Sequence, residues 1–158
     1  MVKKVDVVLE KVLVVLMAFM VLNVLWQVTA RHLLQTPSSY TDELARYLLI
    51  WVGLLGAAYA SGRQMHLAID LLPEKLNPAQ KNKLYIFINF VVGLFALLVM
   101  VIGGLRLVYI TLLLGQTSAA LSIPLGYVYL VVPLSGVLII FYAIHYSINL
   151  YKEIQIKY

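Results

Sequence analysis

Apolar residues follow one another in long stretches along this chain, and charged residues interrupt them at few places. The charge-free stretches are 12–30, 47–62, 84–105 and 107–151. A helix needs about 20 residues to cross a bilayer core of about 30 Å. The last stretch is much longer, and its turn-forming residues at 115–118 and 122–126 should break it. The pattern therefore predicts four membrane-spanning helices, over about 8–31, 39–62, 79–114 and 124–151.

Two of these helices have recognisable first turns. Ser39 is followed three residues later by Asp42, a spacing typical of a capping box, and Pro37 lies just before. Asn77-Pro78 places a capping residue before a proline at the first helical position. The third helix is then longer than a bilayer requires, so we expect it to tilt or to protrude into water.

The first stretch also resembles a secretory signal peptide, because Lys3 and Lys4 precede it. However, it is too long for the apolar region of a signal peptide, and it ends at Arg31-His32 instead of a small-residue cleavage site. We interpret it as a retained span. The expected fold class is an all-α integral membrane protein, with residues 1–158 forming a single transmembrane helical domain.

The composition supports the prediction of a membrane protein by excluding other classes of protein. Hydrophobic residues make up 63% of the 158 residues and charged residues 12%, against about 25% charged residues in an average soluble domain. A soluble domain of this length has too small an interior for so much apolar surface, and a disordered chain would be rich in charge. The chain is also short for a transporter with its own alternating-access machinery.

The positions of Lys and Arg predict the orientation of the helices. Nine of the twelve lie before the first charge-free stretch, between the second and third stretches, or after the last one. Arg31, Arg46 and Arg106 lie toward the opposite side. Basic residues concentrate on the cytoplasmic side, so both termini are expected there (N-in/C-in). The net charge of +5 is thus a topology signal, and no basic stripe indicates a nucleic-acid partner.

The connection 66–76 is not an ordinary polar loop, because leucines are interleaved with Asp70, Glu74 and Lys75. This pattern favours a short interfacial element lying in the membrane surface, with His66 and Asp70 as its polar motif. The alternative is a loop with incidental leucines.

Polar residues within the predicted helices are few. Asn23, Gln27 and Arg31 recur every four residues and form one stripe on the first helix. Because polar groups that face lipid are unfavourable, the stripe should face protein. Packing between helices is the favoured interpretation, and a substrate or ion path is the alternative.

The second helix begins with acidic residues and continues with small ones. Asp42 can pair with Arg46 one turn later, and Glu43 lies on nearly the same side. A proton-relay carboxylate is the alternative interpretation. Small residues then recur at spacings that let another helix approach closely, just after Trp51: Gly53, Gly56, Ala57, Ala60 and Ser61. The partner helix can belong to this chain or to another.

Chemistry-bearing residues are scarce. Cysteine is absent, which excludes thiolate zinc sites, iron–sulfur clusters and cysteine nucleophiles. Among the histidines, His66 and His145 are the pair that a haem-bearing protein would use as ligands, and His32 lies on the other side. No catalytic triad pattern and no phosphate-binding loop occur. We therefore predict no enzymatic activity, no catalytic or substrate-binding residues, no metal and no cofactor.

Five fragments, in order along the chain, resemble the small membrane subunit of tripartite ATP-independent periplasmic (TRAP) transporters. They are Arg31-His32, the segment 40–46 (YTDELAR), Trp51 with Gly56-Ala57, the segment 66–72 (HLAIDLL) and the segment 118–124 (SAALSIP). The resemblance covers about residues 5–149. Family members often have Tyr or Phe in place of His32 and Trp in place of Tyr40. We interpret both differences as interfacial substitutions.

The resemblance implies a role in transport. In this family a periplasmic binding protein captures the substrate, usually an organic acid. A large membrane subunit moves the substrate inward by an elevator mechanism, driven by a sodium gradient. The small subunit packs against the scaffold of the large one, stabilises the assembly and helps to dock the binding protein. The implied location is the bacterial inner membrane, and sialic acid and C4-dicarboxylates are both possible cargoes.

We expect two interaction surfaces from these inferences, with membrane lipids around the rest. The surface toward the large subunit comprises Asn23, Gln27, Arg31, Trp51, Gly53, Gly56, Ala57 and Ala60. The periplasmic surface, near the transiently bound binding protein, comprises Asp42, Glu43, Gln116 and Ser118. Two other functions stay open, namely a haem- or quinone-bearing membrane anchor subunit and a small autonomous homo-oligomeric exporter.

Overall fold

Helices make up nearly all of the part of the chain that the computed structural model describes, which is residues 2–33, 38–63 and 78–156. The elements are α1 (Val2–His32), α2 (Ser39–Gly62), α3 (Pro78–Phe95), the π-helix η3 (Ala96–Gly103), α4 (Gly104–Leu113), α5 (Leu125–Tyr129) and α6 (Val131–Ile156). Within these residues the one β-type contact is an isolated bridge between Thr117 and Pro124. The predicted all-α class is confirmed.

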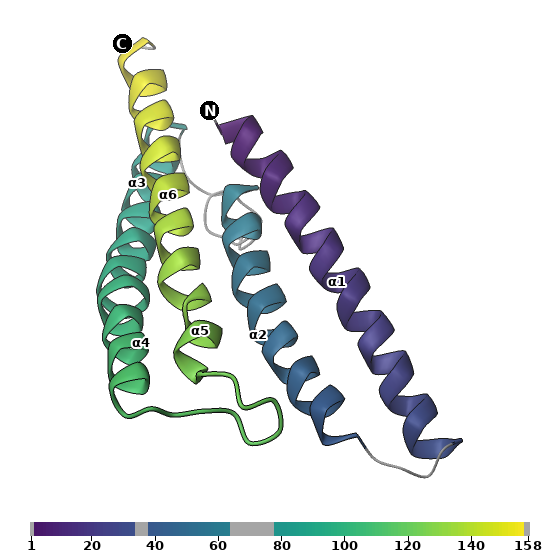
Figure 1. Cartoon of the computed structure of the whole chain (residues 1–158). Coiled ribbons are helices and arrows are strands. Elements are labelled where there is room, and N and C mark those ends of the chain that lie inside the picture. Colours follow the sequence, from purple (N-terminus) through teal and green to yellow (C-terminus); the bar gives the residue numbers. More distant parts are fainter. Residues whose placement is uncertain (1, 34–37, 64–77, 157–158) are drawn as a thin grey trace.

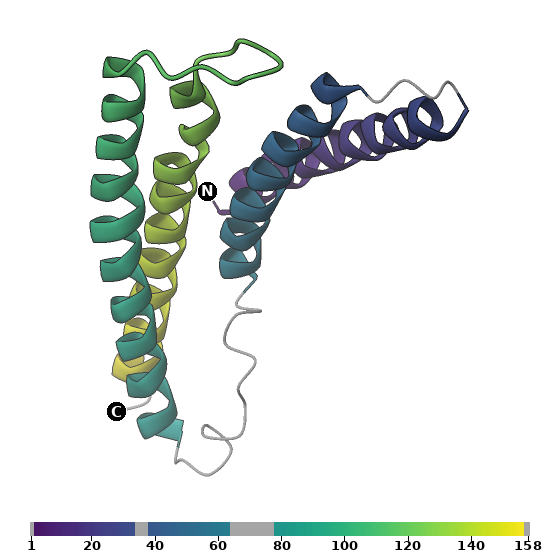
Figure 2. The same ribbon diagram turned by 90° about the horizontal axis from the view of Figure 1, so that it is seen from below.

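The helices form two antiparallel hairpins that meet where α2 packs against α6 (Figure 1). α1 and α2 make the first hairpin. The continuous rod of α3, η3 and α4 packs against α5 and α6 to make the second. Figure 2 shows that α1 leans away from the second hairpin. Both chain ends lie toward one end of the bundle, here called the terminal end, and the loop 114–124 lies at the opposite, loop end.

Three helical stretches are long and apolar enough to cross a membrane, namely Ser39–Gly62, Asn82–Leu113 and Leu125–Lys152. They coincide with the second, third and fourth predicted spans. The first predicted span, 8–31, lies inside α1, and its crossing of the membrane stays a prediction, as does the cytoplasmic position of the termini. The predicted interfacial element with His66 and Asp70 lies outside the described residues.

The start of α2 differs in detail from the predicted capping box. Ser39 lies inside the helix, and the N-cap is Ser38, which makes no side-chain capping hydrogen bond. Instead, the Thr41 hydroxyl donates to the Ser38 carbonyl at 3.0 Å. In a capping box, the side chain three residues after the N-cap must also bond the backbone N–H of the N-cap. Asp42 is engaged elsewhere, by Gln27 and Arg46.

The fourth predicted span is two helices, because it is interrupted at Leu130 between α5 and α6. Pro133 has no N–H to donate to the carbonyl of Tyr129 four residues earlier, so the helical ladder is broken there. The third predicted span is continuous but contains the π-helical turns of η3, where α6 approaches closely. A Cβ on Gly136 of α6 would lie 2.7 Å from the Cβ of Met100.

The buried core lies where α2, α6 and η3 meet. Leu55, Ala58, Ala96, Val131 and Tyr142 are almost inaccessible there. Elsewhere large apolar side chains point outward along whole helices, and on α1 they are more than half exposed: Val8, Val15, Leu22 and Trp26. So continuous an apolar exterior requires lipid or another protein around it.

Candidate functional site

The described side chains form interaction surfaces and not a reaction centre. Across residues 2–33, 38–63 and 78–156, no three His, Cys, Asp or Glu side chains gather closely enough to hold a metal ion. His145 Nε2 lies 3.1 Å from the side-chain amide of Asn149, and its ring stacks edge-on against Tyr146. His66, its conceivable partner as a haem ligand, is outside the described residues.

At the loop end, the carboxylate of Glu43 holds the loop 114–124 against α2. It accepts backbone N–H bonds from Ala119 at 3.1 Å, Ala120 at 2.8 Å and Leu121 at 3.0 Å. The Tyr47 hydroxyl donates to the same carboxylate at 2.7 Å. Hydrogen bonds to an ionised acceptor are stronger than neutral ones. Glu43 therefore fixes the position of this loop relative to the second helix.

The loop itself is internally bonded. Ser118 N donates to Ile123 O, and Leu125 N donates to Gln116 O, both at 2.9 Å. The backbone has positive φ angles at Gly115 (61°) and Ser122 (54°), and the second is unusual for a residue other than glycine. These bonds and turns give the loop a defined shape at the end of the bundle.

The four residues predicted for the periplasmic surface have different surroundings. Glu43 and Ser118 meet at the loop, where Ser118 is buried and its hydroxyl accepts from Leu121 N at 3.2 Å. Asp42 points to the other side of α2, toward α1. The side chain of Gln116 is exposed. The contribution of these residues to docking stays a prediction, with Glu43 and Ser118 holding the loop and Gln116 lying on its surface.

The polar stripe of α1 meets the first turn of α2. The buried Asn23 donates its side-chain amide to the Thr41 carbonyl at 2.8 Å, and Gln27 donates to Asp42 at 3.0 Å. Asp42 in turn bonds Arg46 at 2.6 Å, the predicted pair one turn apart. The two amides are thus used between helices of this chain. Their contact with a second protein stays a prediction.

Arg31, the third residue of the stripe, is exposed beside a small polar hollow of about 170 Å³. The other residues that line the hollow come from both helices of the first hairpin: Gln27, Ser38, Ser39 and Asp42. Asp42 is the acidic residue that lines the hollow, and its carboxylate already bonds Gln27 and Arg46.

The small residues of α2 do not share one environment. A Cβ placed on Gly53 or Gly56 would meet no other atom within 4 Å, and Ala57 is exposed. In contrast, Leu55 and Ala58 on the opposite side are buried against the rest of the chain. We call Gly53, Gly56, Ala57 and Ala60 the open face of α2. On this face Gly53 and Ala57 are exposed, and Gly56 and Ala60 are partly exposed.

Trp51 does not belong to the open face. Its indole N–H donates to the Val128 carbonyl at 3.0 Å, so it ties α2 to α5 inside the molecule. This carbonyl is available because the break between α5 and α6 releases backbone groups from the helical ladder. The tryptophan that was grouped with the small residues by sequence therefore joins the two hairpins.

Sequence reasoning missed a polar cluster at the terminal end. The Tyr142 hydroxyl, on a fully buried side chain, donates to Asp6 at 2.6 Å. One turn later, the Tyr146 hydroxyl donates to the carbonyl of Gly62. Gly62 allows this packing, because a Cβ there would lie 2.7 Å from the Tyr142 ring. These contacts join α1, α2 and α6.

Arg63 closes the cluster on its exposed side. Its guanidinium lies 2.9 Å from the Tyr59 hydroxyl, 5.3 Å from the centre of the Tyr59 ring and 4.0 Å from Glu10. The hydrogen bond to Tyr59 and the charges of Asp6 and Glu10 raise the pKa of Arg63 above its ordinary value. A sequence signal was present: Asp6 and Glu10, and Tyr59 and Arg63, are each four residues apart.

Comparison with known proteins identifies relatives over most of the chain. The sequence model for "Tripartite ATP-independent periplasmic transporters, DctQ component" matches residues 20–153. The sialic acid TRAP transporter small permease protein SiaQ of Vibrio cholerae is 29% identical over 147 residues, which cover 90% of this chain and 81% of the relative.

Two further relatives match over shorter segments. The C4-dicarboxylate TRAP transporter small permease protein DctQ of Rhodobacter capsulatus is 28% identical over 102 residues, 65% of this chain and 44% of that protein. The sialic acid TRAP transporter permease protein SiaT of Haemophilus influenzae is 37% identical over 54 residues, 32% of this chain and 9% of that protein.

Proposed function

We propose a scaffold function for this chain, which belongs to the DctQ component family of TRAP transporters and is a small membrane subunit of such a transporter. In this proposal it lies in the bacterial inner membrane with both termini in the cytoplasm. It stabilises a large elevator subunit that imports an organic acid with sodium and a periplasmic binding protein. The relatives' names make sialic acid and C4-dicarboxylates the candidate cargoes.

The open face of α2 is the observation that carries the proposal. Helices associate in membranes mainly through close packing, and small residues allow their backbones to approach. Gly53, Gly56 and Ala57 satisfy this requirement, and no described part of the chain covers them. The opposite side of α2 is already packed inside the molecule. We propose that a helix of the large subunit covers the open face.

The match to SiaT supports the pairing with a large subunit. The 54 matched residues make up only 9% of that permease, so a segment similar to this chain occurs within a much longer permease protein. In a fused permease a covalent connection would hold the small and large parts together, and in a transporter with separate subunits a non-covalent contact would do the same. In our proposal the open face provides that non-covalent connection.

The distribution of acidic residues favours a scaffold over an autonomous exporter. No Asp or Glu occurs in 44–69 or in 75–152. The acidic residues of the first hairpin lie near its two ends, and those with described partners are bonded within the chain: Asp6, Glu10, Asp42 and Glu43. Ion coupling usually relies on ionisable groups inside the membrane. Family membership likewise does not favour a haem- or quinone-bearing anchor.

The proposal is tested by co-purification of the large subunit with an affinity-tagged form of this chain. The double variant Gly56→Leu/Ala57→Leu fills the open face with bulky side chains, and we expect it to recover much less large subunit than the natural chain. Because a side chain at Gly56 has open space, the variant itself should fold normally.

Ala18→Leu is the control, since it makes one of the same two substitutions, Ala to Leu, at an exposed position of α1. Its recovery of the large subunit should equal that of the natural chain. Undiminished recovery with the double variant would refute the proposed position of the large subunit.

A further inference from the structure

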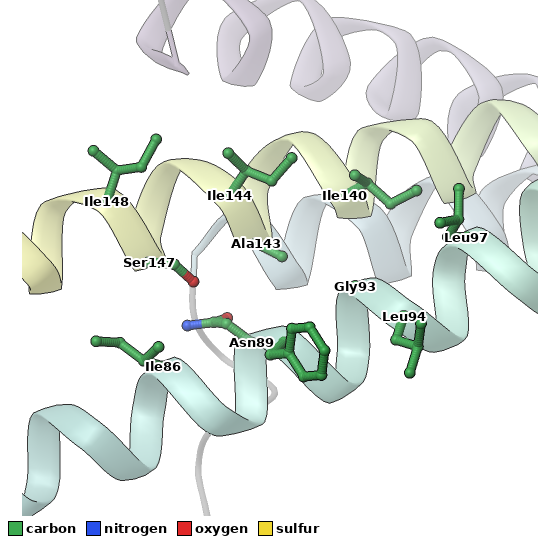
Figure 3. A pocket seen from close by; sticks show the side chains of 11 residues that line it. Ile86, Asn89, Gly93, Leu94, Leu97, Ile140, Ala143, Ile144, Ser147 and Ile148 are labelled. Carbon is green, nitrogen blue, oxygen red and sulfur yellow. The ribbon is translucent and has the colours of Figure 1, made fainter.

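A groove of about 400 Å³ lies between α3 and α6, away from the open face and from the loop (Figure 3). The two helices pack closely at Gly93, where a Cβ would lie 3.7 Å from that of Ala143. Toward the terminal end, apolar side chains such as Ile86, Phe90 and Ile148 line the groove. Among all the lining residues, only Asn89 and Ser147 are polar.

Asn89 is the unusual residue of this groove. Its side chain is only 3% exposed, and its amide nitrogen has no hydrogen-bond partner among the described residues. Figure 3 shows this amide reaching from α3 into the space between the helices, on the side of Ser147. A buried donor without an acceptor is costly, and such groups are rare in folded proteins. Because this nitrogen exposes less than 1 Å², an acceptor in the groove can bond it only when the Asn89 side chain turns toward the groove.

Two lysines extend the walls of the groove toward the terminal end. Lys83 precedes Ile86 by three residues on α3, and Lys152 follows Ile148 by four residues on α6, so each continues a row of lining residues. Both lysine side chains are exposed. Asn89 follows Lys83 by six residues on α3, which is about 9 Å along the helix. Along the groove, the two lysines at the terminal end are thus followed by the unpaired amide of Asn89 and then by an apolar slot.

We propose that this groove binds one glycerophospholipid. An acyl chain lies in the apolar slot, an ester carbonyl accepts from the Asn89 amide, and the phosphate lies between Lys83 and Lys152. A lipid matches all three zones at once, because its anionic, ester and hydrocarbon parts follow in the same order. The proposal rests on the membrane position of α3 and α6 and is independent of the transport role.

A transmembrane helix of another protein fits the groove less well. A backbone carbonyl of a helix can accept a second hydrogen bond, as Thr41 of α2 does from Asn23, so Asn89 alone does not distinguish a helix from a lipid. However, a helix would bring no anion to the two lysines unless a particular side chain supplied it. Basic residues between transmembrane helices commonly recognise lipid head groups.

The test is a lipid titration of the full-length purified chain, followed by native mass spectrometry. The probes are dioleoyl phosphatidylglycerol and its ether-linked analogue, which has the same head group and chains but no carbonyl. One hydrogen bond corresponds to about a fivefold difference in affinity. We expect the natural chain to bind the ester lipid about fivefold more tightly than the ether lipid.

Variants assign this preference to Asn89. Asn89→Leu should bind both lipids equally, at the level of the ether lipid with the natural chain. Asn149→Leu is the matched control, because it makes the same substitution on α6 at an exposed position outside the groove. It should keep the full preference. Lys83→Gln/Lys152→Gln should weaken binding of both lipids and leave the ester preference intact.

Three results would overturn the proposal. The natural chain could show no ester preference, Asn89→Leu could retain it, or the bound lipid could be lost when the large subunit is co-purified. The last result would show that a partner helix occupies the groove. The ester-to-ether comparison uses the natural chain, so the test does not depend on the folding of any variant.

Discussion

The two sides of α2 contain the same kinds of residue and differ in what surrounds them. On one side, Ala58 is fully buried, and Gly62 lies so close to Tyr142 that a methyl group would overlap the ring. On the other side, a Cβ placed on Gly53 or Gly56 would meet no atom of another element within 4 Å. Small residues on the first side allow this chain to pack on itself. On the second side they leave room for another chain.

A pattern of small residues therefore indicates a close contact between helices, but it does not identify the partner helix. In α2 the pattern continues from the open face into the internal contact over a few turns. Three-dimensional surroundings separate the two uses, because only the internal positions have a facing side chain. The comparison predicts opposite consequences for the same substitution on the two sides.

The largest effect on stability is expected for Gly62→Ala. The added methyl group would overlap the Tyr142 ring, and overpacking of this kind costs about 1–3 kcal/mol. The free energy of unfolding, measured in detergent by denaturant titration followed by circular dichroism, should fall by that amount. Gly53→Ala makes the same change in open space and should cause no loss. Equal losses in both variants would erase the distinction between the two sides.

Asn23→Leu tests the seam between α1 and α2 and should have an intermediate effect. The substitution removes the 2.8 Å hydrogen bond to the Thr41 carbonyl. Hydrogen bonds between membrane helices contribute about 0.6 kcal/mol on average and up to about 1.7 kcal/mol. The same titration should show a loss in this range. Thr29→Val removes a bond within α1 only and should leave the seam intact; a comparable loss there would contradict our account of Asn23.

Trp51→Phe should have a smaller effect, of about 0.6 kcal/mol, because it removes one hydrogen bond and keeps an aromatic ring. The expected signature is faster hydrogen exchange at α5, where the Val128 carbonyl loses its donor. Tyr40→Phe is a control, since it removes a hydroxyl from an aromatic residue of α2 whose side chain is exposed. Unchanged exchange at α5 would show that Trp51 does not hold the two hairpins together.

The smallest effect on global stability is expected for Glu43→Gln, whose consequence is local. An amide side chain carries no charge and presents only one acceptor oxygen to the three backbone N–H groups of the loop. Hydrogen exchange at Ala119, Ala120 and Leu121 should become severalfold faster. Glu10→Gln, at the opposite end of the bundle, should leave this exchange unaltered. Unaltered exchange with Glu43→Gln would show that the loop holds its shape without the carboxylate.

The order of the helices could be predicted from the sequence because apolar length and charge act locally. The predicted bounds of the second helix, 39–62, coincide with those of α2, and the Asp42–Arg46 pair was correctly expected. Such features depend on residues a few positions apart. The same local reasoning placed Glu43 on nearly the same side of the helix as Arg46 but had no means of finding the loop residues that Glu43 binds.

Most of the missed features depend on residues far apart in the chain. Asp6 bonds Tyr142 across 136 positions, and Glu43 bonds Ala120 across 77. Hydropathy also does not distinguish η3 from an α-helix, since both are uniformly apolar. Pro133 is an exception, because its effect is local, yet the predicted fourth span, 124–151, was one continuous helix and the interruption between α5 and α6 was missed. Exposure of the open face likewise became visible only when the hairpins were assembled.

The most direct test of the scaffold account measures the exposure of Gly53 with and without the large subunit. The chain has no cysteine, so a single Gly53→Cys substitution can carry a nitroxide spin label in lipid nanodiscs. Oxygen dissolves well in lipid, and its collision rate with the label reports lipid contact. We predict a high rate in the chain alone and a marked decrease in the complex, while Ala18→Cys stays accessible in both. An equal oxygen collision rate at position 53 in both states would contradict the account.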